Sequence, residues 1–218
     1  MSKKESDFDV AHRPGLACQH AFDWLAHNLY QMGDDAALIA GESWQAAEML
    51  RRFPSLTLLD PVPEGVDGII NKLGIEQPPL VQSGNTGFPA IGVVATSHLG
   101  NIHRALKTIT FTGCNLYFIL EGRLARFMAE HHSNHSEQTI SITGLLAELE
   151  ATGFQLQQRL EIQGFESAFQ HYLGEIAARA NRFDLRDRRH FAMRRDFVSA
   201  SSSSAWSTLV CLALERRQ

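Results

Sequence analysis

The sequence contains few of the features that mark secreted, membrane or nucleic-acid-binding proteins. Its three cysteines, Cys18, Cys114 and Cys211, lie far apart among apolar residues, which favours free thiols in a reducing compartment over disulfides. No apolar run approaches the roughly 20 residues that span a bilayer, and residues 1–7 are largely polar, so we expect neither a membrane span nor a secretory signal. A formal net charge of −4 provides no general basic field for a nucleic-acid partner. We therefore expect a cytoplasmic protein.

Short apolar runs alternate along the chain with segments of helical spacing. The strand-like runs are 36–41, 56–59, 80–81, 91–96 and 114–120. The helical patterns are 16–32, 43–53, 101–109, 143–151 and 165–182. The strand-like runs are apolar almost throughout, which is typical of parallel strands covered on both faces by helices. The pattern predicts an α/β fold with a doubly wound, mostly parallel sheet.

The C-terminal part of the chain has a different pattern. Residues 154–162 alternate apolar and polar side chains, and residues 206–214 form a last apolar run. These two runs predict an antiparallel hairpin with an arginine-rich insertion, 165–198, between its strands. A chain of 218 residues buries enough surface for one such domain. We place it at 34–218, after an N-terminal extension and helix at 1–33.

The first strand and helix have the layout of a nucleotide-binding unit but lack most of its glycines. The turn after the first strand reads Gly41-Glu42-Ser43-Trp44, with one glycine where three are usual. The second strand ends on Asp60, whose carboxylate can accept hydrogen bonds from ribose hydroxyl groups. The sequence therefore predicts the fold more firmly than the ligand.

Four segments in this order resemble the class I S-adenosylmethionine-dependent methyltransferases. The segments are Leu56–Pro61, Asn85–Pro89, Val93–Leu99 and Leu145–Phe154. The resemblance covers roughly residues 34–217 and implies a seven-stranded sheet whose last two strands form a reversed hairpin. It also implies that S-adenosylmethionine is the cofactor and that a small molecule accepts the methyl group.

The resemblance implies a site at the carboxyl ends of the strands. Gly41, Glu42, Asp60, Asn85 and Ser97 would line the cofactor, with Glu42 near the methionine ammonium group. The chain departs from the family pattern in two places: one glycine remains in the first turn, and Asn85 stands where the family has an acid. A second hypothesis is therefore a non-catalytic scaffold of the same fold, which binds a protein partner and in which the bulky Trp44 fills the space of the cofactor. A homodimer is compatible with either hypothesis.

Two histidines, His98 and His103, flank the end of the 91–96 strand. Ligands bind at such strand ends in open α/β sheets, so His98 is the candidate general base and His103 a candidate substrate contact. The alternative for His98 is that it caps or packs against the next helix.

A cluster of histidines has both a functional and a structural interpretation. His131 and His135 would share one face of a helix and could bind zinc, but Ser133 and Asn134 weaken such a helix, and a polar loop that also holds His132 is the alternative.

The insertion contains Arg186 and Arg189 among other arginines, aspartates and phenylalanines. It could contact a substrate or an acidic partner, or cover a pocket as a lid. The alternative is a solvated helix face with internal ion pairs.

Overall fold

The computed structural model describes residues 16–33, 35–59, 62–74, 80–81, 85–95, 106, 110–111, 115–122, 141–163, 200–201 and 207–217. The chain divides into two compact units. The larger unit comprises Phe22–Glu121, His135–Arg159 and Val210–Gln218, and the smaller comprises Met1–Ala21, Gly122–Asn134 and Leu160–Leu209. Apart from Leu106, the expected helices at 101–109 and 165–182 lie outside the described residues.

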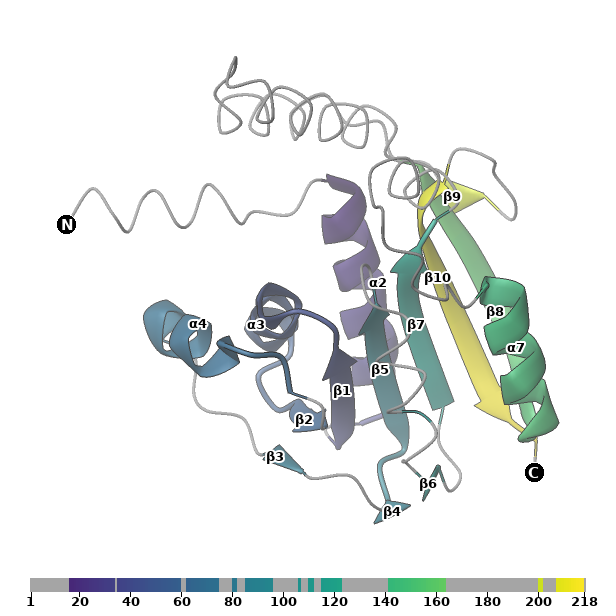
Figure 1. Ribbon diagram of the computed structural model, residues 1–218, viewed down its shortest axis with the longest axis horizontal. Helices are drawn as coiled ribbons and strands as arrows, with labels where there is room; N and C mark the ends of the chain where they lie inside the picture. The colour runs from purple at the N-terminus through teal and green to yellow at the C-terminus, as the bar shows by residue number, and fades with distance from the viewer. Residues whose placement is uncertain are drawn as a thin grey trace, which may run out of the picture. The chain divides into compact units, whose positions relative to one another are not determined.

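One main sheet organises the described chain (Figure 1). Its strands, in spatial order, are β3 (Leu80–Val81), β2 (Thr57–Leu59), β1 (Ala36–Ala40), β5 (Ala90–Ala95), β7 (Asn115–Glu121), β10 (Ser207–Arg216), β8 (Phe154–Gln163) and β9 (Ala200–Ser201). A second, two-stranded sheet pairs β4 (Asn85–Thr86) with β6 (Thr110–Phe111). The described helices are α2 (Leu16–Gln31), α3 (Ser43–Arg52), α4 (Val66–Leu73) and α7 (Ile142–Ala151).

The predicted α/β architecture is confirmed. Strands β3, β2, β1, β5 and β7 pair in parallel, and Figure 1 shows β10 running in the opposite direction to its neighbours β7 and β8. The expected number of seven strands is wrong, because six described strands have three residues or more and the edge strands β3 and β9 have two each. Pro78 and Pro79 lack the N–H groups that would extend β3.

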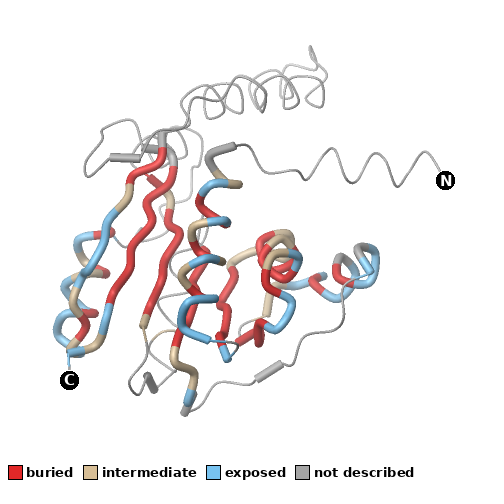
Figure 2. The backbone as a smooth tube through the Cα atoms, turned by 180° about the vertical axis from the view of Figure 1, so that it is seen from behind, coloured by how far each residue is buried: buried red, intermediate tan, exposed pale blue. Residues whose placement is uncertain are grey.

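Both faces of strands β1, β2, β5 and β7 are buried over most of their length, as Figure 2 shows for β1, β5 and β7. On one face, α7 packs through Ile142, Leu145 and Leu149 in the same core cluster as Val93 and Phe118. Ser141 caps α7, since its Oγ accepts a hydrogen bond of 3.0 Å from the Gly144 N–H. A helix therefore covers this face of the sheet.

Helix α2 covers the opposite face and approaches closely at one glycine. The strand register aligns Leu38, Gly92 and Tyr117 in one row across β1, β5 and β7. A Cβ atom at Gly92 would lie 3.1 Å from the Leu29 Cδ1 and 3.3 Å from the Leu25 Cδ1, both on α2. The absence of a side chain at Gly92 lets α2 lie directly on the sheet.

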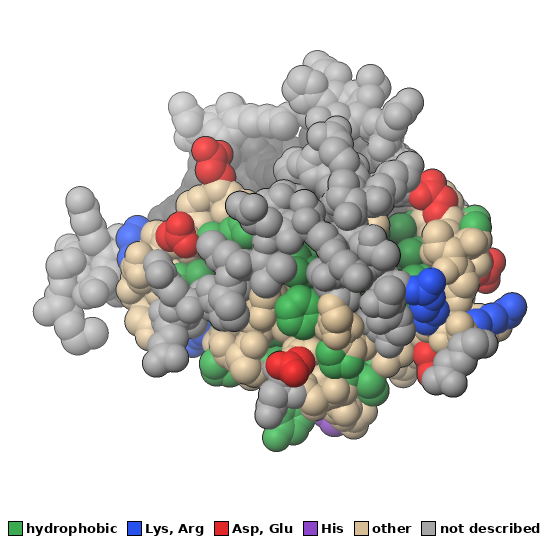
Figure 3. All heavy atoms as spheres, turned by 90° about the horizontal axis from the view of Figure 1, so that it is seen from below, with side chains coloured by type: hydrophobic (Ala, Val, Ile, Leu, Met, Phe, Trp, Pro, Cys, Tyr) green, Lys and Arg blue, Asp and Glu red, His purple; other side chains and the backbone are tan. Residues whose placement is uncertain are grey.

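The described surface carries charges of both signs. Figure 3, seen from below, shows acidic and basic side chains interspersed with apolar ones on the described part of this face. The large apolar residues that are exposed include Tyr30 and Met32 at the end of α2, and Leu156 in β8. No helix in the described ranges has the length and hydropathy of a membrane span.

Replacing Gly92 by Val should destabilise the protein. The added methyl groups would meet Leu25 and Leu29, so we expect the free energy of unfolding to fall by about 1–3 kcal/mol. Denaturant titration measures this change. Gly87→Val is the matched control, because no atom lies within 4 Å of a Cβ at the exposed Gly87. Equal stability of the two variants would show that α2 does not need the gap at Gly92.

Candidate functional site

The strand order identifies one edge of the sheet as the candidate site. The chain passes from β1 outward to β2 and β3 on one side, and β5 then pairs on the other side of β1. This reversal creates a topological switch point at the carboxyl ends of β1 and β5, where open α/β sheets bind ligands. The Gly41 N–H donates to the Val94 carbonyl oxygen over 2.9 Å and continues the β1–β5 ladder into the turn.

Glu42 begins helix α3 immediately after this turn. It is the N-cap residue, and with Gln45 it forms a capping box. The Glu42 backbone N–H donates to the Gln45 Oε1 over 3.1 Å, and the Gln45 side chain is completely buried. The box places a carboxylate at the positive end of the α3 dipole, where a negative charge is stabilised.

Trp44 lies in the first turn of α3 and contacts two of its neighbours. Its indole Nε1–H donates a hydrogen bond to the Glu42 Oε2. Its ring meets that of Phe22 edge to face, with centroids 5.8 Å apart and planes at 83°. Phe22 belongs to α2 and is 1% exposed. These contacts hold the indole toward α2 and leave it half-buried.

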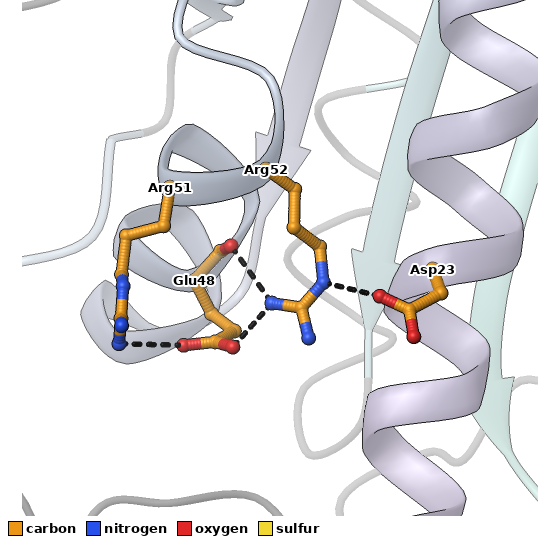
Figure 4. A network of polar contacts seen from close by, with 4 residues as sticks. All are labelled: Asp23, Glu48, Arg51 and Arg52. Atoms are coloured by element: carbon orange, nitrogen blue, oxygen red, sulfur yellow. Dashed lines mark hydrogen bonds and ion pairs between the residues drawn. The ribbon is translucent and has the colours of Figure 1, made fainter.

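An ion-pair network ties the last turn of α3 to α2 (Figure 4). The Arg52 Nε donates to the Asp23 Oδ1 over 2.8 Å, and the Arg52 Nη1 contacts the Glu48 carboxylate. The guanidinium also lies 5.7 Å from the centre of the Phe22 ring. Burial lowers the pKa of Arg52, but the hydrogen bonds that its guanidinium donates to the carboxylates of Glu48 and Asp23 outweigh this effect and raise the pKa. Phe22 thus contacts both ends of α3.

Loss of the Arg52 charge should destabilise the protein. In Arg52→Met the carboxylates of Asp23 and Glu48 lose a half-buried partner, so we expect the free energy of unfolding to fall by about 1–2 kcal/mol. Arg51→Met is the control, since Arg51 is more exposed and lies 3.7 Å from Glu48; its effect should stay below about 0.5 kcal/mol. Urea titration measures the free energy of unfolding of both variants. Equal decreases in the two variants would contradict a larger stabilising contribution from Arg52 than from Arg51.

Most of the predicted polar site residues lie outside the described residues. These are Asp60, Ser97, His98, His103, Arg186 and Arg189, together with the cluster His131, His132 and His135. In the part of the chain that the structure describes, no group of three or more His, Cys, Asp or Glu residues could hold a metal ion. The structure brings Gly41 and Glu42 together at the carboxyl end of β1.

The structure does not bring Asn85 to this edge. Asn85 lies in β4, which pairs with Thr110 and Phe111 of β6 in the second sheet. Strand β5 begins at Ala90 and runs away from β4 toward the candidate site, and Figure 1 shows β4 beside the amino ends of the parallel strands. The sequence places Asn85 in a turn-forming run, and the pairing with β6, about 25 residues away, has no local signal.

Sequence reasoning missed the contacts that organise the turn. The capping box was readable, because Glu42 and Gln45 have the spacing of an N-cap acceptor and its N3 partner. The Phe22 contacts with Trp44 and Arg52 had no such signal, because they join segments more than 20 residues apart.

Comparisons with known proteins identify the fold. No family model matches the sequence, and no curated protein matches it either. Among solved structures, a SAM-dependent methyltransferase from Thermotoga maritima, described as a possible histamine N-methyltransferase, is similar at 12% identity and a TM-score of 0.53; the match covers 93% of this chain and 92% of that one.

Two further structures are similar at the same level. A candidate sarcosine dimethylglycine methyltransferase from Galdieria sulphuraria has 11% identity and a TM-score of 0.52, over 90% of this chain and 85% of that one. The [4+2]-cyclase SpnF has 12% identity and a TM-score of 0.50, over 90% of this chain and 79% of that one. The chain therefore has the fold of class I methyltransferases.

Proposed function

We propose that the chain is an S-adenosylmethionine-dependent methyltransferase that acts on a small molecule. The cofactor would bind at the carboxyl ends of β1 and β5. The switch point there supports this location, and the fold shared with two described methyltransferases supports the reaction class.

The observation that carries the proposal is the carboxylate of Glu42 at the first turn. A helix N-terminus after the first strand usually receives a phosphate group. Here Glu42 caps α3, so a phosphate would meet a negative charge, whereas a cation would meet an attractive one. S-adenosylmethionine carries an ammonium group, a sulfonium centre and one carboxylate, and it has no phosphate. The turn therefore suits this cofactor better than a dinucleotide.

The roles of the other site residues are inferred from the sequence alone. Asp60 would accept hydrogen bonds from the ribose hydroxyls, and Ser97 would line the cofactor. The cofactor, when bound, supplies an electrophilic methyl group to a substrate nucleophile. His98 would remove the proton of that nucleophile, and His103, Arg186 and Arg189 would contact the substrate. The chain would mainly position the two reactants and exclude water.

A non-catalytic scaffold is the second candidate. The single glycine of the turn and the bulky Trp44 beside Glu42 favour it. The SpnF cyclase, which has the same fold, supports the general point that this fold does not determine the reaction.

Calorimetric titration with S-adenosylhomocysteine separates the two candidates. An enzyme should bind it with a dissociation constant in the micromolar range, on the order of −8 kcal/mol. ADP should give no heat, because its phosphates are repelled by Glu42. A folded protein that shows no heat at millimolar S-adenosylhomocysteine would favour the scaffold.

The Asp60→Ala variant tests the proposed ribose contact. Loss of charge-assisted hydrogen bonds should weaken S-adenosylhomocysteine binding by roughly tenfold or more. Asp67→Ala serves as the control, because Asp67 is an exposed acid in the first turn of α4. Unchanged affinity in Asp60→Ala would remove Asp60 from the site.

A further inference from the structure

Trp44 is an unusual residue for the first turn after β1. Its indole has one polar atom, and that atom donates its hydrogen to the Glu42 carboxylate. The ring cannot turn away freely, because its edge-to-face contact with the buried Phe22 fixes its orientation. The hydrogen-bond donor therefore reaches Glu42 from a fixed direction.

Glu42 is held from its backbone as well as its side chain. The buried Gln45 accepts the Glu42 backbone N–H, and the capping box engages the carboxylate. Without the indole, the carboxylate would keep its capping contact but lose the donor at Oε2. A carboxylate held by one contact keeps more rotational freedom than one held by two, and it therefore loses more conformational entropy when it pairs with a ligand.

We propose that Trp44 is a positioning residue that aims the Glu42 carboxylate at the ammonium group of the bound amino acid. This inference rests on the proposed function. Trp44 acts through Glu42 and does not itself need to touch the ligand. Trp44 is the residue that departs most from the glycine-rich pattern. Its size suggests that it blocks the cofactor, whereas in this role it assists binding.

Two ligands isolate the effect. S-adenosylhomocysteine contains the amino-acid ammonium group, and 5′-methylthioadenosine is the same adenosyl thioether without the amino-acid part. Trp44→Phe removes the indole N–H and keeps an aromatic ring against Phe22, and Glu42→Gln removes the charge. Each single variant should weaken S-adenosylhomocysteine binding by roughly tenfold and leave 5′-methylthioadenosine within about twofold. The double variant should lose no more than the more affected single variant.

Trp24→Phe is the matched control. Trp24 also donates its indole N–H to a side chain, Gln158, over 3.3 Å, and also meets an aromatic ring, that of Tyr117, edge to face. It lies outside the proposed site, so its substitution should leave both affinities unchanged. Thermal unfolding of every variant checks that the fold is intact.

The possible outcomes separate the two proposals. If the wild type binds neither ligand, the proposed function fails and the role of Trp44 fails with it. If the wild type binds both but Trp44→Phe binds S-adenosylhomocysteine normally, or loses both ligands equally, only the positioning role is overturned. A selective loss that Glu42→Gln reproduces and the double variant does not deepen supports it.

Discussion

The geometry of the candidate site depends on the packing of Phe22 against α3. This buried ring of α2 contacts Trp44 in the first turn of α3 and lies beneath the guanidinium of Arg52 in the last turn. Helix α2 can lie close enough to do this because Gly92 presents no side chain to Leu25 and Leu29. Gly92 of β5 thus allows the close approach of α2 to the sheet, and Phe22 of α2 in turn positions α3. The direction in which α3 begins decides where the Glu42 carboxylate stands.

This packing leaves the negative charge of the Glu42 carboxylate at the start of α3. In phosphate-binding relatives of this architecture, the unpaired N–H groups of the first helix turn receive the ligand. Here the capping box of Glu42 and Gln45 already uses part of that capacity and adds a negative charge. The turn lies at the switch point of the sheet, and we infer from the Glu42 carboxylate that it favours a positively charged group over a phosphate. A ligand with an ammonium group and no phosphate fits this preference.

Local patterns in the sequence predicted the elements well and the long-range contacts poorly. The apolar run 36–41 and the helical spacing from Ser43 to Phe53 became β1 and α3, each one residue shorter than predicted, because burial and periodicity are local properties. The antiparallel neighbours β8 and β10 also followed from their patterns. Asn85 was expected beside the cofactor, but β4 pairs with β6 at the other end of the strands. Trp44 could be recognised as bulky, whereas its partner Phe22 could not be inferred.

We propose that the turn from β1 into α3 receives the amino-acid part of the cofactor. Hydrogen exchange of the backbone amides from Glu42 to Trp44, with and without saturating S-adenosylhomocysteine, tests it most directly. We expect slower exchange at these amides when the ligand is added, and unchanged exchange in α7 on the other face of the sheet. Exchange at the turn that stays the same while the ligand is bound would contradict it.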